Sequence, residues 1–289
     1  MKKVFSIIFL IFLFVQSQVN AEDCYSKYCP VQPYPVSSNG SQKLQKYTGI
    51  NFISRHIAQS IIKSQLKKET KGKYKVDMQL YSTKDLMNGK FKSLHFVGTD
   101  LNAEGIYISK LEARTLCDFN SVELNKNTLK FRENMAMSFN MEISSDDLRK
   151  TVKSTGYIDL LNKVNLSSFG ITFFKLSSAD VFVQNSKIYF VVNVSTPLSS
   201  RTIPIKLSSD LKVSDGKIVL TQVDFANRIK IIDLNELTTL LNYLNPLTFT
   251  TNILDNKTSK IKIDSVNIVG TKICIDGYIY IPKNTVTKG

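Results

Sequence analysis

The chain has 289 residues, enough for one large domain or two small ones. Its 38 basic residues outnumber the 24 acidic ones and give a net charge of +14, so an anionic partner is favoured. Four cysteines without a C-x₂-C pair, and only two histidines, exclude a recognisable zinc-binding pattern.

Residues 1–21 have the features of a secretory signal peptide. Lys2 and Lys3 precede an apolar run over 4–15, and Val19 and Ala21 are the small residues of a cleavage site. The run is shorter than the roughly 20 residues of a transmembrane helix. Two basic residues are lost with the segment, which leaves 36 basic against 24 acidic residues, or +12. We therefore expect an exported protein of the periplasm or extracytoplasmic envelope.

In that location the expected anionic partner is a phospholipid headgroup or another envelope polymer, with nucleic acid excluded. Solubility alone is the alternative explanation of the charge. Residues 22–46 are rich in Pro, Ser and Gln and are predicted to be an extended linker. A single folded domain is then expected over 47–289.

The four cysteines permit disulfides in an exported protein. Cys24 and Cys29 are close in sequence and form the candidate pair, closing a small loop. Cys117 and Cys274 are then either partners or two buried thiols.

The segment 51–68 has the periodicity of a helix. Ile53, Ile57 and Ile61 are four residues apart, and a second set broadens the apolar arc: Ala58, Ile62 and Leu66. The remaining row is polar and mostly basic, formed by Arg55, Gln59, Lys63 and Lys67. So broad an apolar arc indicates a helix enclosed by a curved sheet. An ordinary packing helix is the simpler alternative, and a helix lying in a membrane interface is the functional one.

Strands dominate the rest of the chain. Apolar and polar residues alternate over 74–81, 135–143 and 188–194, which is typical of antiparallel sheets with one buried face. Hairpin turns are predicted at Asn185-Ser186, Asp215-Gly216 and Asp276-Gly277. The segments 97–108 and 269–279 share a glycine pattern, which predicts the same hairpin used twice. Shorter helices are predicted after Ser144, around 158–164, and from Asp233 to a stop at Pro246.

No residue set amounts to a catalytic site. The sequence has no G-x-S-x-G, P-loop or dinucleotide-binding motif, so we expect neither enzymatic activity nor a cofactor or metal. The alternative of a hydrolase or transferase with His56 or His95 as base requires a carboxylate or nucleophile within about 3 Å of the ring. Met135, Met137 and Phe139 alternate on one strand, and such adaptable side chains suit either a core or a pocket for acyl chains.

Residues 86–116 contain an L-x-x-G-x-F-x-x-L pattern from Leu86 to Leu94, a strand and glycine at 96–98, and a G-I-x-I-x-x-L pattern from Gly105 to Leu111. In these patterns the chain resembles the LmeA-like family of exported bacterial phospholipid-binding proteins, formerly a domain of unknown function. The D-G-K-I-V-L hairpin at 215–220 and a closing strand pair at 261–281 also fit. The Cys-containing segment 115–119 and the proline-bearing leader depart from the family pattern.

The resemblance implies an α+β fold, with a long antiparallel sheet curled around an N-terminal long helix and an apolar groove for phospholipid acyl chains. The expected function is lipid transport or envelope maintenance, without catalytic residues. The candidate lipid-binding residues are Ile53, Ile57, Ile61, Phe91, Phe96, Met135, Met137, Phe139, Phe173 and Leu240. The candidate headgroup- or membrane-facing residues are Arg55, Lys63, Lys67, Lys90 and Lys92. The alternative is a non-enzymatic structural or interaction module with a basic binding face.

Overall fold

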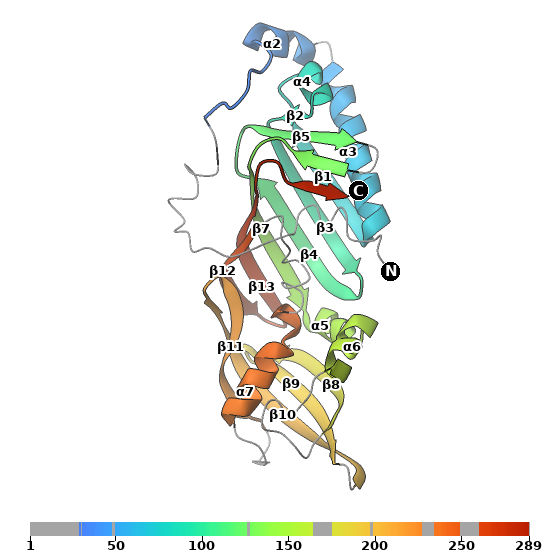
Figure 1. The fold of residues 1–289 in the computed structure, drawn as a ribbon, viewed down its shortest axis with the longest axis vertical. Helices are drawn as coiled ribbons and strands as arrows, with labels where there is room; N and C mark the ends of the chain where they lie inside the picture. The colour runs from blue at the N-terminus through green and yellow to red at the C-terminus, as the bar shows by residue number, and fades with distance from the viewer. Residues whose placement is uncertain are drawn as a thin grey trace.

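The computed structural model describes residue 29 and residues 31–47, 50–125, 128–163, 175–196, 199–226, 234–248 and 260–288. Within these residues the chain is mostly antiparallel β-sheet with a few helices, which confirms the α+β expectation in this coarse form. Two larger sheets lie end to end in an elongated molecule (Figure 1). The predicted signal peptide, residues 1–21, lies outside the described residues.

The first sheet has six strands in the order β1-β3-β4-β7-β13-β12. They are β1 (Lys71–Gln79), β3 (Ser93–Ala103), β4 (Ile106–Thr115), β7 (Met135–Ser144), β13 (Lys272–Ile281) and β12 (Lys260–Val269). The alternation predicted over 135–143 is realised in β7, where Met137, Phe139 and Met141 are buried and the polar residues between them are half-buried. One face of this sheet therefore forms the core, and the other is polar.

The second sheet has four strands in the order β11-β10-β9-β8. They are β11 (Lys217–Phe225), β10 (Ser199–Ser214), β9 (Lys187–Thr196) and β8 (Lys175–Gln184). Helix α7 (Leu234–Tyr243) lies across this sheet (Figure 1), and its buried Leu240 and Leu241 join the same hydrophobic core as the first sheet. A smaller sheet, β14-β6-β5-β2, consists of β14 (Val286–Lys288), β6 (Thr128–Phe131), β5 (Asn120–Asn125) and β2 (Lys90–Phe91).

Helix α5 (Ser145–Val152) connects the two larger sheets, followed by α6 (Thr155–Lys163). The Oγ atom of Ser145 accepts a hydrogen bond from the backbone N–H of Val183 in β8, at 2.8 Å. The carboxylate of Asp147, 8% exposed, accepts a bond from the Ser144 backbone N–H and contacts Ser109 of β4. Beside β12, the Ile263 N–H bonds to the carbonyl of Gly216. These polar contacts hold the two sheets together.

Two hairpin predictions are confirmed. Asn185 and Ser186 have φ values of 51° and 57°, and Asp215 and Gly216 have 51° and 70°. Positive φ at both central residues is what the two-residue type I′ turn requires, because its backbone twist matches that of the flanking strands.

The hairpin predicted at Asp276-Gly277 is wrong, because both residues lie inside β13 and the turn falls at Gly270 and Thr271. Gly277 pairs with Phe139, and a Cβ atom added to it would lie 2.9 Å from two ring carbons of Phe139. The same Cβ would lie only 2.3 Å from the Lys262 backbone carbonyl oxygen in β12, so both this backbone and the aromatic ring require glycine here. The predicted repeat of one hairpin is also wrong. The two copies differ in structure, because Gly98 lies in β3 while Gly270 lies in a turn.

Helix α3 (Ile50–Glu69) occupies the segment predicted to be helical. It packs beside the edge strand β1, joined at its start by α2 (Asn39–Tyr47) and α4 (Thr83–Met87) (Figure 1). In the described residues no sheet curls around α3, so that part of the expected fold is not found. The outer positions of β1 carry Lys71, Lys73 and Lys75, which discourage pairing of this edge with another strand.

Candidate functional site

The candidate lipid-binding residues on the strands belong to the core. Phe91, Phe96, Met135, Met137, Phe139 and Leu240 are at most 5% exposed. The strand register explains this for the aromatic pair, because Phe96 and Phe139 both lie opposite Ala113 of β4 and share the buried face. Phe173 lies outside the described residues. We therefore assign the described members of this set to packing.

The isoleucines predicted to line the groove are exposed instead. Ile53 is 61% exposed, Ile57 is 56% exposed and Ile61 is 48% exposed, and Phe52 beside them is 57% exposed. Residues four apart lie on one stripe of a helix, so these isoleucines form a continuous apolar row on the outer face of α3. The expectation that they face a concave sheet is wrong. We call Ile53, Ile57 and Ile61 the outer row. Phe52 is exposed next to the start of this row but lies about 100° around the helix from Ile53.

The opposite face of α3 explains this orientation. Leu66 is 1% exposed, and Ala58 and Ile62 pack against the same core. Gln59 is 8% exposed, and its side-chain amide donates a 3.1 Å hydrogen bond to the carboxylate of Asp77 in β1. The helix therefore directs its second apolar set and part of its polar row towards the sheet, which leaves the outer row in solvent.

The candidate basic residues have different surroundings. Lys67 is exposed and Lys63 is half-buried on α3. The guanidinium of Arg55 lies 5.6 Å from the centre of the Phe52 ring, and its buried Nε has no hydrogen-bond partner among the described residues. The ammonium of Lys90 donates to the Pro35 carbonyl at 2.9 Å and lies over the Tyr34 ring. Lys92 is half-buried in the turn between β2 and β3.

The predicted Cys24–Cys29 pair is also corrected. Cys29 forms its disulfide with Cys117, 88 residues away, with a Cα–Cα distance of 5.1 Å. Cys24 lies outside the described residues, and Cys274 is a free, half-buried thiol. Sequence proximity did not decide the pairing because the fold brings Cys117 next to residue 29. A disulfide is compatible with an oxidising, extracytoplasmic location.

The described part of the predicted linker is docked on the domain. We call residues 31–47 the arm. The Tyr34 hydroxyl donates to the carbonyl of Asn120 at 2.8 Å, and its ring meets Phe119 edge-on at 5.8 Å. Burial, reinforced by Tyr81, raises the pKa of Tyr34 above its usual value of 10, so the phenol keeps its proton and remains a donor. A tyrosine between two prolines was the only signal for this contact in the sequence.

One ion pair meets the requirement set for the catalytic alternative. The Nε2 atom of His95 lies 2.9 Å from a carboxylate oxygen of Glu112, on the polar face of the first sheet. Glu112 also pairs with Lys110, and Lys110 reaches Glu142, which contacts Lys272. No nucleophile is hydrogen-bonded to His95 in the described part of the chain. The arrangement is a row of ion pairs that mostly join neighbouring strands, and such pairs stabilise a sheet.

Replacing Glu112 by glutamine is expected to lower stability at neutral pH but not in acid. The hydrogen bond from His95, followed by that from Lys110, lowers the pKa of Glu112 below its usual 4.5. A lowered carboxylate pKa adds stability above the unfolded-state pKa, and this stability is lost as pH falls through the folded-state value. The loss should stay below about 1 kcal/mol, because both side chains are about one-third exposed. Urea unfolding from pH 7 to pH 3, with Glu104→Gln as control, measures it; an equal loss at both ends would contradict it.

No described group of three or more His, Cys, Asp or Glu side chains is arranged to hold a metal ion. Among the helices described, none combines the length and apolar character needed to cross a membrane. Comparison with family models, curated proteins and solved structures finds no significant match. The resemblance to LmeA-like proteins therefore stays a prediction. The fold and the site together define an antiparallel α+β protein in which one basic helix carries an exposed apolar row.

Proposed function

We propose that this protein is an exported lipid-binding protein that docks on anionic membrane surfaces of the cell envelope through the outer row of α3. The observation that supports the proposal is the solvent exposure of Phe52, Ile53, Ile57 and Ile61 on one helix. Large apolar side chains usually occur singly on protein surfaces, whereas a contiguous patch marks an interaction site. A surface helix with such a row is the usual form of an interfacial membrane anchor.

The charge of the two N-terminal helices favours lipid as the occupant of this face. The α2 sequence contains two lysines and no acid. The α3 sequence contains Arg55, Lys63, Lys67 and Lys68, and its single acid, Glu69, is the last residue. Long basic side chains beside an apolar row keep their charged ends among lipid phosphates while their stems contact the acyl region. A basic and apolar face is complementary to an anionic bilayer surface.

The expected binding is reversible. Fully burying an exposed isoleucine or phenylalanine yields about 1.5–3 kcal/mol, and the outer-row residues are about half exposed already, so each contributes roughly 1 kcal/mol. Each lysine near an anionic surface adds about 1 kcal/mol. A total of roughly 5–7 kcal/mol corresponds to micromolar to millimolar affinity, which suits a peripheral protein better than a permanent anchor.

This proposal places the lipid on the outer face of α3 and replaces the acyl groove expected between α3 and the sheet. The groove is not retained because its three α3 residues face solvent and its strand residues are packed. In this proposal the protein contributes to envelope maintenance or lipid transport by contacting phospholipid at the membrane surface, not by storing acyl chains. The proposal involves no catalytic step.

The test is flotation of the purified mature protein with vesicles of phosphatidylglycerol mixed with phosphatidylcholine, compared with phosphatidylcholine alone. The wild type should float with the anionic vesicles. Ile57→Asp should bind at least tenfold more weakly, because a charge replaces apolar area at the interface. Ile158→Asp on α6, where the native side chain is also exposed at 43%, is the matched control and should float normally.

Two results would contradict the proposal. Equal flotation of wild type and Ile57→Asp would place the lipid elsewhere. A wild type that does not float but forms a dimer, and becomes monomeric in Ile57→Asp, would make the outer row a protein interface. Thermal unfolding of both variants checks that they remain folded.

A further inference from the structure

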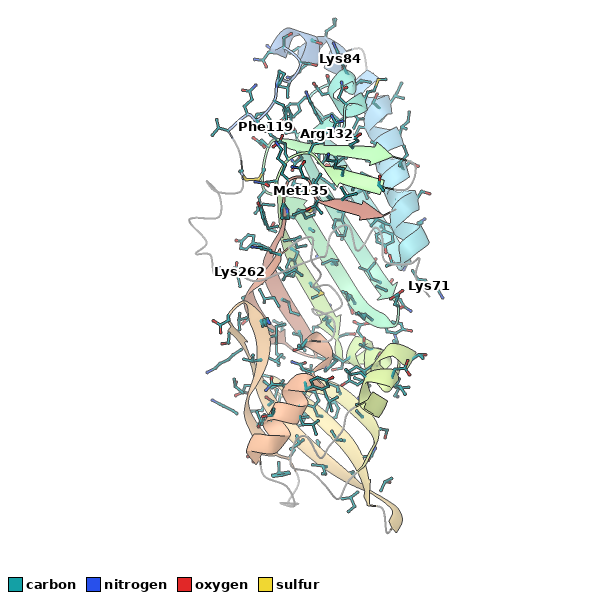
Figure 2. All side chains as sticks on the ribbon, in the orientation of Figure 1. Lys71, Lys84, Phe119, Arg132, Met135 and Lys262 are labelled. Carbon is teal, nitrogen blue, oxygen red and sulfur yellow. A yellow bond between two sulfur atoms is a disulfide. The ribbon has the colours of Figure 1, made fainter. Side chains whose placement is uncertain are left out.

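The arm is fastened to the body at a small number of points. At its start the Cys29–Cys117 disulfide attaches it next to Phe119. Further along, Lys90 binds the carbonyl of Pro35, and the backbone N–H of Ser37 donates to the Asp85 carboxylate at 3.2 Å. Figure 2 shows Phe119 and Lys84 at the end of the molecule where α2 and α4 lie. The arm therefore runs over this end before it reaches α3.

Helix α4 joins the arm to the first turn of α3. The backbone N–H of Thr83 donates to the side-chain oxygen of Gln45 in α2, at 2.9 Å. The Thr83 hydroxyl lies 3.1 Å from Asn51 Oδ1 and 3.0 Å from the Ser54 hydroxyl, both on α3. Asn51 and Ser54 flank Phe52 and Ile53, and Ile53 is the first member of the outer row. A movement of the arm is therefore transmitted to the helix that we place on the membrane.

Apart from the disulfide, the arm is held by contacts that are only partly buried. The bonds of Tyr34, Ser37 and Gln45 are all part-buried, and the Lys90–Pro35 bond is exposed. Hydrogen bonds that compete with water each add little net stability. Segments held by few buried apolar contacts open locally far below the free energy of global unfolding. The disulfide is the one covalent cross-link described between this segment and the body, so it limits how far such opening can go.

The two sulfur-bearing residues differ in access. Cys117 is 2% exposed and belongs to the core, whereas Cys29 is half-buried at the surface. An external thiolate approaching from solvent therefore reaches the Cys29 side of the bond. The buried Cys117 then leaves as the free thiol, which remains inside the folded body.

We propose that the Cys29–Cys117 disulfide is a redox switch for membrane docking, and that its reduction releases the arm and weakens the seating of α3. The inference rests on the proposed function. An external dithiol reduces the bond: one thiolate attacks Cys29 Sγ, and Cys117 leaves as a thiolate that takes up a proton. The second thiol of the reductant then displaces Cys29 as its thiol. The protein gains two electrons and two protons, and the reductant becomes a disulfide.

Two readouts test the switch separately on the mature protein. Tryptic cleavage after Lys43 and Lys46, within α2, reports release of the arm without any lipid. Flotation with the phosphatidylglycerol-containing vesicles reports docking. On reduction with dithiothreitol, cleavage should accelerate at least tenfold and vesicle affinity should fall at least threefold, and both should recover on reoxidation. Cys29→Ser should behave as reduced protein under all conditions, whereas Cys274→Ser should behave as wild type.

The outcomes distinguish the two proposals. If the oxidised wild type does not float, the proposed function fails, whatever trypsin shows. If it floats and reduction leaves either arm cleavage or vesicle affinity unchanged, the switch is overturned while docking stands. Loss of the far-ultraviolet circular dichroism spectrum on reduction would also overturn the switch, because the disulfide would then hold the whole fold.

Discussion

Gly89→Ala is expected to lower the free energy of unfolding by more than about 3 kcal/mol. Gly89 follows α4 with φ +71°, in the left-handed region where a side chain is strained. An added Cβ would lie 1.7 Å from the carbonyl oxygen of Val122, so β5 would have to move away. That movement breaks the 2.9 Å hydrogen bond from the Val122 N–H to the Gly89 carbonyl, which begins the pairing of β2 with β5.

The matched control for this substitution is Gly40→Ala in α2. Gly40 has no heavy atom within 4 Å of the position of its added Cβ, and alanine is favoured over glycine in a helix. Its stability should be unchanged or slightly higher. Urea unfolding followed by circular dichroism measures both variants. A Gly89→Ala protein that loses less than about 1 kcal/mol would mean that the chain around Val122 adapts freely.

Asp147→Ala is expected to cost about 2–4 kcal/mol, the second largest effect. Its carboxylate completes the capping box of α5 with Ser144 and also binds the Ser109 hydroxyl in β4. Removing it leaves the Ser144 N-cap in place but deprives the Ser144 backbone N–H and the Ser109 hydroxyl of their acceptor, at the point where α5 connects the two larger sheets. Both sheets should lose stability together, so unfolding should stay a single transition at a lower urea concentration.

The neighbouring residue is the control. Asp146 has a 77% exposed side chain and a distant 3.8 Å contact with Arg149. Asp146→Ala should therefore change stability by less than about 0.5 kcal/mol. Equal losses in the two variants would show that helix-dipole charge, rather than the buried hydrogen bonds of Asp147, stabilises this junction.

Local patterns predicted most of the secondary structure because they act over short distances. The alternation in β7 and β9 was read directly from the sequence, whereas α7 ends at Tyr243, before the predicted stop, and Pro246 begins a further helical stretch. The turn at Asp215-Gly216 was also correct, whereas the identical dipeptide at Asp276-Gly277 lies within a strand. The difference is tertiary: Gly277 faces Phe139, where a side chain would clash, so packing rather than turn formation explains that glycine.

The disulfide partner also depended on the tertiary structure. A loop between Cys24 and Cys29 is the entropically easiest to close, and sequence distance favours it. The fold instead brings Cys117 within 5.1 Å of Cys29 between Cα atoms, next to the Tyr34 hydrogen bond that docks the arm. Sequence composition described residues 22–46 as a linker, because hydrogen bonds between distant residues leave no periodic signal.

The sequence by itself determined that residues around 51–68 form a basic helix with two apolar sets. Only the tertiary structure decided which set is buried, because hydrophobicity alone would favour burying the three isoleucines over Ala58, Ile62 and Leu66. The buried set packs on the core and consists of Ala58, Ile62 and Leu66, while Gln59 donates a hydrogen bond to Asp77. This arrangement satisfies both apolar and polar groups at the edge of β1. Ile53, Ile57 and Ile61 then lie on the opposite side of a rigid helix and remain in solvent.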